Sequence, residues 1–230
     1  MRKKHAAFTL IEMVVVMAII MILAGLVVAI TGYVNRKSAM TRATSEIETL
    51  KLACQNYKAE TGGYPQDTKS DGTAGYTDTL SPKKHFNPLS TEYTNAGKYL
   101  YQQLTGDKVG FSAEPDGIPD DGEQVYLKDF DARMLKADRD TTNKITRVYY
   151  FWDPFGYPYG YSTAAMREEQ IYQKAIKAGT AGTTRKTGDN LPGFNTAAFD
   201  IWSTVGNKIT VMPAAPAERE AEQAKWLKNW

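Results

Sequence analysis

The sequence predicts an α+β protein in which a long N-terminal helix packs on a small antiparallel sheet, with a loop-rich insertion. Three observations lead to this class: an uncharged apolar run over 13–34, an apolar stripe at helical spacing after it, and aromatic segments with turn signals in the C-terminal half. The chain has 230 residues, and the part after the apolar run, about 195 residues, is enough for one globular domain.

The first expected element is a membrane-spanning helix over 8–34. Met13 to Val34 contains no charged residue, and a helix of this length, about 33 Å at ~1.5 Å per residue, crosses a hydrocarbon core of ~30 Å. The run is also longer than the apolar part of a cleaved secretory signal. One acid, Glu12, lies directly before it. A carboxylate in a membrane is costly, so Glu12 predicts a partner for its charge, in this chain or in another.

We expect the same helix to continue past the membrane, over 35–61. Charged residues such as Glu46 fall on its other faces, Gly62 supplies a C-terminal cap, and Pro65 prevents continuation. The sequence thus predicts one helix from Phe8 to Thr61. The apolar residues that recur every three or four positions on one face are Met40, Ala43, Ile47, Leu50, Cys54 and Tyr57.

The middle of the chain, 66–146, is predicted to be an irregular, variable insertion. Residues 67–89 are rich in Thr, Ser, Gly, Asp and Pro, which predicts a long loop. Helical spacing over 92–104, followed by Gly106, predicts a short helix, and 125–127 could form a strand.

The clearest β signal opens the predicted sheet region, 147–212. Residues 147–152 and 157–161, joined by the turn sequence Asp153-Pro154-Phe155-Gly156, indicate a hairpin. Its aromatic side chains are more typical of a core than of a carbohydrate-binding face. The remaining predictions are a helix over 164–178, a loop over 180–195, strands over 199–203 and 208–212, and a short helix in the charged C-terminal tail 213–230.

The N-terminal pattern K-K-x-x-A-F-T-L-I-E resembles the leader of type IV prepilins and type II secretion pseudopilins. The resemblance implies that prepilin peptidase removes leader 1–7, cutting between Ala7 and Phe8, and methylates the amine of Phe8. It also implies that Glu12 pairs with the N-terminal amine of a neighbouring subunit during filament assembly. The residue before the cut is usually Gly in these families, and here it is Ala7.

Two later segments resemble the major (G-type) pseudopilin of type II secretion. W-D-P-F-G-Y-P-Y over 152–159 is similar to its D-P-W-G-x-P-Y segment, and F-D-I-W-S-T-V-G over 199–206 to its F-D-L-x-S-x-G stretch. The resemblance implies a pilin-like fold, and a periplasmic globular domain over 35–230 held by one helix in the bacterial inner membrane. The implied partners are further copies, other pseudopilins and the inner-membrane assembly platform, with export of proteins as the function.

Other function classes are weighed against this one. A type IV pilus subunit, major or minor, is the nearest alternative, and a non-polymerising membrane-anchored binding module is the second. An enzyme is not expected, because the mature chain would keep one histidine, His85, and shows no catalytic or phosphate-binding motif. A nucleic-acid partner is not expected either. The net charge is +2, about −1 without the leader, and no basic stripe is present.

A calcium site is a further hypothesis. Four carboxylates could supply the hard oxygen ligands that calcium prefers, although their spacing is not that of an EF-hand. The resemblance implies that the family's own calcium loop is lost, because Lys208 stands where an acid is needed. Cys54 is the only cysteine, so no intramolecular disulfide can form, and we expect a buried thiol. The four candidate ligands are Asp116, Asp120, Asp121 and Glu123.

Overall fold

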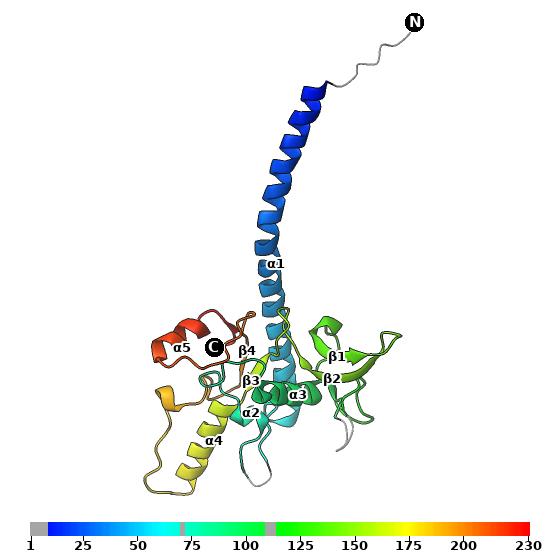
Figure 1. The fold of residues 1–230 in the computed structure, drawn as a ribbon. Helices are drawn as coiled ribbons and strands as arrows, with labels where there is room; N and C mark the ends of the chain where they lie inside the picture. Colours follow the sequence, from blue (N-terminus) through cyan, green and yellow to red (C-terminus); the bar gives the residue numbers. More distant parts are fainter. Residues whose placement is uncertain (1–8, 70–71, 109–113) are drawn as a thin grey trace. The chain divides into compact units, whose positions relative to one another are not determined.

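The computed structural model describes residues 9–69, 72–108 and 114–230, except the side chains of residues 28 and 29. The chain divides into two compact units, Met1–Thr41 and Arg42–Trp230, which are described separately. The class is α+β as predicted: a long N-terminal helix whose second half packs on antiparallel strands (Figure 1).

Helix α1, Leu10–Thr61, is the longest element. The predicted end is confirmed: Gly62 adopts φ 85° and donates its N–H to the Lys58 carbonyl at 2.8 Å, a left-handed conformation that favours glycine. The predicted start at Phe8 lies outside the described residues. In the second unit the predicted stripe is confirmed, since Ala43, Ile47, Leu50 and Cys54 are buried.

Two antiparallel sheets form the β part of the second unit. One pairs β1, Leu135–Arg139, with β2, Ile145–Phe151. The other has the order β3-β4-β5, from strands Gly160–Ser162, Asp200–Ser203 and Leu227–Lys228. The two sheets share no ladder among the described residues, and α3 packs against β2 of the first and β3 of the second (Figure 1).

The remaining helices lie between and beside the strands. The helices predicted over 92–104 and 164–178 are confirmed as α3 and α4, and α3 ends at Gly106 with φ 72°. The full set is α2, Tyr76–Thr79; α3, Thr91–Thr105; α4, Ala164–Lys177; α5, Pro216–Gln223; and the 3-10 turns η1, Ala132–Met134, and η2, Gly188–Asn190.

Two clusters of buried side chains hold the second unit together. The larger joins the second half of α1 to α3 and both sheets, and includes the aromatic residues Phe151, Tyr159 and Tyr161. The prediction that the aromatic hairpin residues belong to the core is therefore confirmed for these three. The smaller cluster consists of Leu80, Phe86, Tyr93, Ala96, Trp202 and Trp226.

The predicted hairpin is only partly correct. The chain does reverse at Asp153, whose N–H donates to the Tyr157 carbonyl at 2.7 Å. The returning segment, however, meets the first strand in one isolated bridge, Trp152 to Pro158, and the ladder partner of β2 is β1. The Tyr159 N–H still donates to the Phe151 carbonyl at 3.2 Å, and the chain then leaves β2 and pairs with β4 as strand β3. Strand β1 lies inside the predicted irregular insertion and was not expected.

Two predicted strands are wrong. Residues 125–127 form no strand, because the N–H groups of Tyr126 and Leu127 both donate to the Leu104 carbonyl at the end of α3. Residues 208–212 form none either, and the third strand of the second sheet is β5, in the predicted tail. Glu46, predicted to lie on a face other than the apolar stripe, is buried as well.

Candidate processing and assembly site

Glu12 lies in the first turn of α1, where its carboxylate caps the helix. Its Oε2 accepts hydrogen bonds from the backbone N–H and the hydroxyl of Thr9, both at 2.8 Å. The Thr9 Oγ1 in turn accepts the Glu12 N–H at 3.3 Å. This reciprocal arrangement is a capping box, which satisfies the first amides of a helix. The T-x-x-E spacing was visible in the sequence, yet the sequence analysis treated Glu12 only as a charge in need of a partner.

The capping bonds leave the charge of Glu12 without a counter-ion. Both end on Oε2, and within the described part of the chain no Lys or Arg forms an ion pair with Glu12. A carboxylate can accept about four hydrogen bonds, so Oε1 is able to receive an additional cationic donor. The nearest candidates for cleavage and methylation, Ala7 and Phe8, lie outside the described residues. The geometry therefore supports an acid held ready for a cation from elsewhere.

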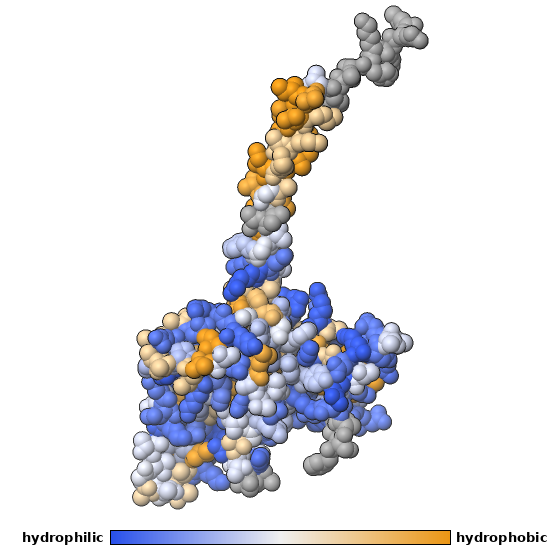
Figure 2. Space-filling model, in the orientation of Figure 1, coloured by the Kyte–Doolittle hydropathy of each residue, from blue (hydrophilic) through white to orange (hydrophobic). Residues whose placement is uncertain are grey.

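The helix surface around Glu12 is apolar and exposed. Of the described side chains from Leu10 to Val34, all are exposed, and Leu10 itself is 83% exposed. Figure 2 shows this apolar stretch along the first half of α1. The helix is long and apolar enough, by length and composition, to cross a membrane once. Such a surface requires either lipid or other apolar helices around it.

The four candidate calcium ligands lie within the described residues, and two of their carboxylates have separate partners. Asp116 accepts the N–H of Ile118 at 3.0 Å, and Glu123 forms an ion pair with Lys108 at 2.5 Å. Within residues 9–69, 72–108 and 114–230, no group of three or more His, Cys, Asp or Glu side chains converges to hold a metal. The structure thus does not bring the four residues together, and calcium binding there stays a prediction.

Sequence reasoning missed a buried charged cluster around Glu46. Its Oε2 accepts the Tyr159 hydroxyl at 2.6 Å, and its Oε1 accepts Nε of Arg42 at 2.8 Å. Burial, and then the adjacent Glu46 carboxylate, raise the pKa of Tyr159. The Arg42–Glu46 pair was visible at i,i+4 spacing, but nothing local indicates the tyrosine, which lies 113 residues further along the chain. The cluster ties α1 to the segment before β3.

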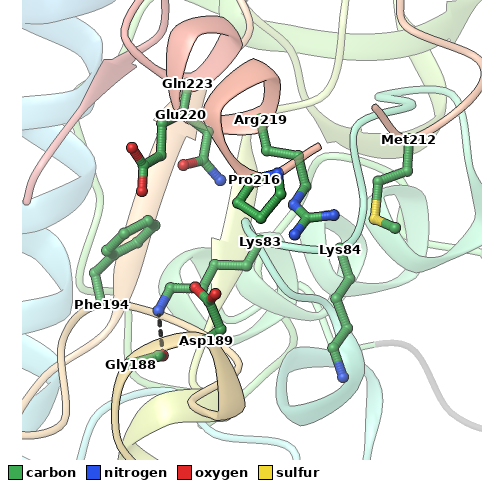
Figure 3. A pocket seen from close by; sticks show the side chains of 10 residues that line it. All are labelled: Lys83, Lys84, Gly188, Asp189, Phe194, Met212, Pro216, Arg219, Glu220 and Gln223. Carbon is green, nitrogen blue, oxygen red and sulfur yellow. Dashed lines mark hydrogen bonds between the residues drawn. The ribbon is translucent and has the colours of Figure 1, made fainter. Parts of the chain in front are cut away.

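A pocket of about 380 Å³ opens beside α5 (Figure 3). Two of its three cations are already engaged: Lys83 donates to the Gly188 carbonyl at 2.8 Å and lies over the Phe194 ring, and Arg219 donates to backbone carbonyls. Acids line the same pocket, namely Asp189 and Glu220. Because the charges nearly balance, the pocket favours neither an anion nor a cation.

Cys54, His85 and Ser81, three side chains of types used in nucleophilic catalysis, have other contacts or are buried. Cys54 is buried, as predicted, and burial raises the pKa of its thiol, so the reactive thiolate is disfavoured. His85 accepts the Ser81 N–H on Nδ1 at 2.9 Å, and burial lowers its pKa. The Ser81 hydroxyl donates instead to the Pro192 carbonyl. This arrangement does not activate Ser81 as a nucleophile.

Comparison with known proteins identifies the N-terminal region. Residues 2–28 match the family described as the prokaryotic N-terminal methylation motif. The chain carries a prepilin-type leader. This motif spans the expected cut between Ala7 and Phe8, Glu12 and most of the apolar helix, and it supports the resemblance to pilins and pseudopilins. No curated protein and no solved structure matches the chain.

The prepilin-type leader has consequences for processing and location. A motif of this kind is typical of structural subunits and not of enzymes. Such subunits are processed by prepilin peptidase and assemble with other pilin subunits. With one apolar N-terminal helix, it fits a single-pass anchor in the inner membrane.

Proposed function

We propose that this chain is a pilin-like subunit that polymerises into a type II secretion pseudopilus and so supports protein export. The observation that carries the proposal is a single acid, Glu12, at the head of an apolar exposed helix that directly follows a prepilin-type leader. Cleavage before Phe8 creates a positively charged N-terminus on each subunit. In the low dielectric of a helix bundle, that amine and the Glu12 carboxylate of a neighbour attract each other strongly, and each is costly when unpaired.

The choice of secretion over a pilus rests on the globular domain. The W-D-P-F-G-Y-P-Y segment resembles the major pseudopilin, and the single cysteine cannot close the disulfide loop that adhesive pilins use. We place this domain in the periplasm. A type IV pilus subunit is the second candidate. Loss of this chain from its native cell should reduce the export of folded proteins into the medium without removing surface filaments; the opposite result would favour the pilus.

The first test is the N-terminus of the protein isolated from native membranes. Intact mass and stepwise N-terminal degradation should show a chain that begins with N-methylated Phe8. A chain that begins at Met1 would overturn the assembly proposal, because no new amine would exist to pair with Glu12.

The second test concerns the charge of Glu12. Glu12→Gln keeps an oxygen that can accept the Thr9 N–H but removes the charge, so we expect normal membrane insertion and strongly reduced filament assembly. Thr9→Ala is the matched control, since it weakens the helix cap and keeps the acid. Filaments are quantified by shearing and electron microscopy. Normal assembly of Glu12→Gln, or an equal loss in Thr9→Ala, would contradict charge pairing.

A further inference from the structure

A hollow of about 300 Å³ lies beside β1 and differs from the other pockets in its charge. Three of its lining residues are cations, Arg133, Lys136 and Arg139, and none is an acid. Apolar side chains complete the lining, so the hollow combines cationic and apolar side chains. These other residues are Ala132, Leu135, Ala137 and Trp152.

The aromatic ring of this basic hollow is held in place. Trp152 donates its Nε1–H to the Arg133 carbonyl at 2.7 Å, and the Lys136 Nζ lies 5.0 Å from the centre of the ring. Arg133 pairs with Asp131 at 2.6 Å, an acid that does not line the hollow. Among the described residues, no ion pair includes Lys136 or Arg139. Arg139 donates an Nη1–H to the Asn143 carbonyl at 3.0 Å, so both side chains have neutral partners, and no described acid neutralises their charges.

The hollow is connected to the predicted membrane anchor by a short stretch of chain. Asp131 interacts electrostatically with Arg42, and Arg133 with Glu46, so η1 lies close to the first residues of the second unit. Arg42 lies only eight positions after Val34, the end of the uncharged run. At ~1.5 Å per residue this is about 12 Å of helix. If α1 is the membrane anchor of the proposed function, this short connection keeps the second unit within reach of the lipid headgroups.

We propose that the basic hollow binds the phosphate of an anionic phospholipid in the membrane that holds α1. Arginine and lysine are suited to phosphate oxygens. Basic side chains and tryptophan are the residues that favour the headgroup region of a bilayer. A soluble anion would make no use of the apolar part of the lining, whereas a lipid can contact it with its hydrocarbon. The short tether also holds lipid at a high effective concentration. The alternative occupant, which the test must distinguish from lipid, is an acidic segment of a second copy of this chain.

The test is a chemical footprint of Lys136 in the full-length chain, reconstituted into vesicles. Vesicles of phosphatidylcholine alone are compared with vesicles that also contain phosphatidylglycerol, and acylation of each lysine by an amine-reactive ester is followed by mass spectrometry. We expect acylation of Lys136 to be about fivefold slower with phosphatidylglycerol, and the protection to disappear at high salt. Lys174 on α4, exposed and outside the hollow, is the reference amine.

A pair of variants separates a specific site from bulk charge. Arg133→Gln with Arg139→Gln should restore the acylation rate of Lys136 in phosphatidylglycerol, because both side chains are exposed and their loss leaves the fold intact. The matched control, Lys177→Gln with Lys208→Gln, removes the same charge from exposed positions elsewhere and should keep Lys136 protected.

Each other outcome overturns the proposal. Equal rates in the two vesicles, protection that survives loss of the arginines, or equal effects of both variants would exclude a lipid site. Protection produced by inorganic phosphate in lipid-free detergent would assign the hollow to a free anion. Protection that depends on protein concentration instead of lipid would assign it to a second copy. Flotation of the chain with the vesicles is measured in parallel, so failure of the membrane anchor is distinguished from failure of the lipid site.

Discussion

At the scale of single residues, the second unit contains one buried carboxylate, that of Glu46, whose hydrogen bonds contribute to its stability. Glu46 is 5% exposed and meets a charged and a neutral donor, Arg42 and Tyr159. Removing one partner from such a buried pair is costly, because the other group stays out of water and has no hydrogen bond to replace its lost solvation. The cluster joins α1 to a segment that the chain reaches much later, and it therefore fixes how the helix docks.

We expect Tyr159→Phe to lower the free energy of unfolding by about 1–2 kcal/mol, since it leaves the buried Glu46 with Arg42 alone. Tyr149→Phe is the matched control, because it removes an exposed hydroxyl that donates to Asp138 at 2.7 Å and should cost at most about 0.5 kcal/mol. Both are measured by denaturant unfolding of the full chain in detergent. Equal costs would show that the buried hydroxyl contributes nothing beyond a surface contact.

A second buried acid gives a pH dependence. Burial raises the pKa of Asp200 to about 6 from 3.8, although its carboxylate accepts N–H groups of Phe194 and Asn195. Between these two pH values the folded chain holds the proton and the unfolded chain does not. Lowering the pH from 7 towards 4 should therefore raise the free energy of unfolding, by on the order of 2 kcal/mol from this group.

The measurement compares how the free energy of unfolding changes with pH in the wild type and in Asp200→Asn, not the absolute stabilities of the two chains. Asp200→Asn cannot titrate, so its unfolding free energy should rise less than that of the wild type as the pH falls to 5. Titration of His85, whose pKa is lowered by burial, acts in the opposite direction but is common to both chains. Parallel pH profiles would contradict a raised pKa at Asp200.

At the scale of elements, the C-terminal segment is part of the core and not a tail. Strand β5 pairs with β4, and directly before it the Trp226 ring stacks on Trp202 with centres 6.0 Å apart. Trp226 also contacts Phe86, with ring centres 5.3 Å apart. A segment that closes both a sheet edge and an aromatic cluster is required for the second unit to be stable.

Trp226→Ala should therefore lower the free energy of unfolding by about 3–5 kcal/mol, the usual cost of removing a large buried aromatic side chain. Val211→Ala, in the predicted strand that does not form, should change stability by no more than about 0.5 kcal/mol, because Val211 is 77% exposed. Thermal unfolding of both variants shows whether the C-terminal segment is part of the core or a dispensable tail. A stable Trp226→Ala chain would mean that the segment is dispensable.

The sequence predicts the features that depend on neighbouring residues and misses those that depend on contacts between distant residues. The ends of α1 and α3 were predictable because glycine caps at Gly62 and Gly106 depend only on nearby residues. Strand β5 was not, since two residues, Leu227 and Lys228, show no alternation. The same holds for the Glu46 cluster, whose tyrosine is distant in sequence. For the processing site, residue types and order sufficed to predict Glu12, whereas its bond to Thr9 emerged from the structure.

At the scale of the whole molecule, one helix serves two environments. The described side chains of α1 up to Val34 are exposed, whereas from Ala43 onwards one face is buried in the core of the second unit. The two halves are therefore separable by function. The first requires lipid or neighbouring helices, and the second supplies side chains without which the globular core is incomplete.

Two truncations test this division. Removing residues 1–35 takes away the apolar half and leaves every buried residue of α1, so the remaining chain should be soluble, folded and free of detergent. Removing residues 1–50 also deletes Ala43, Ile47 and Leu50 from the core. At about 2–5 kcal/mol for each large apolar side chain, that loss approaches the 5–15 kcal/mol by which a typical domain is stable, and the shorter chain should be unfolded. Circular dichroism and cooperative thermal unfolding distinguish the two chains. If both fold alike, the second half of α1 is no part of the core; if neither folds, the globular unit needs the first half of the helix for its stability.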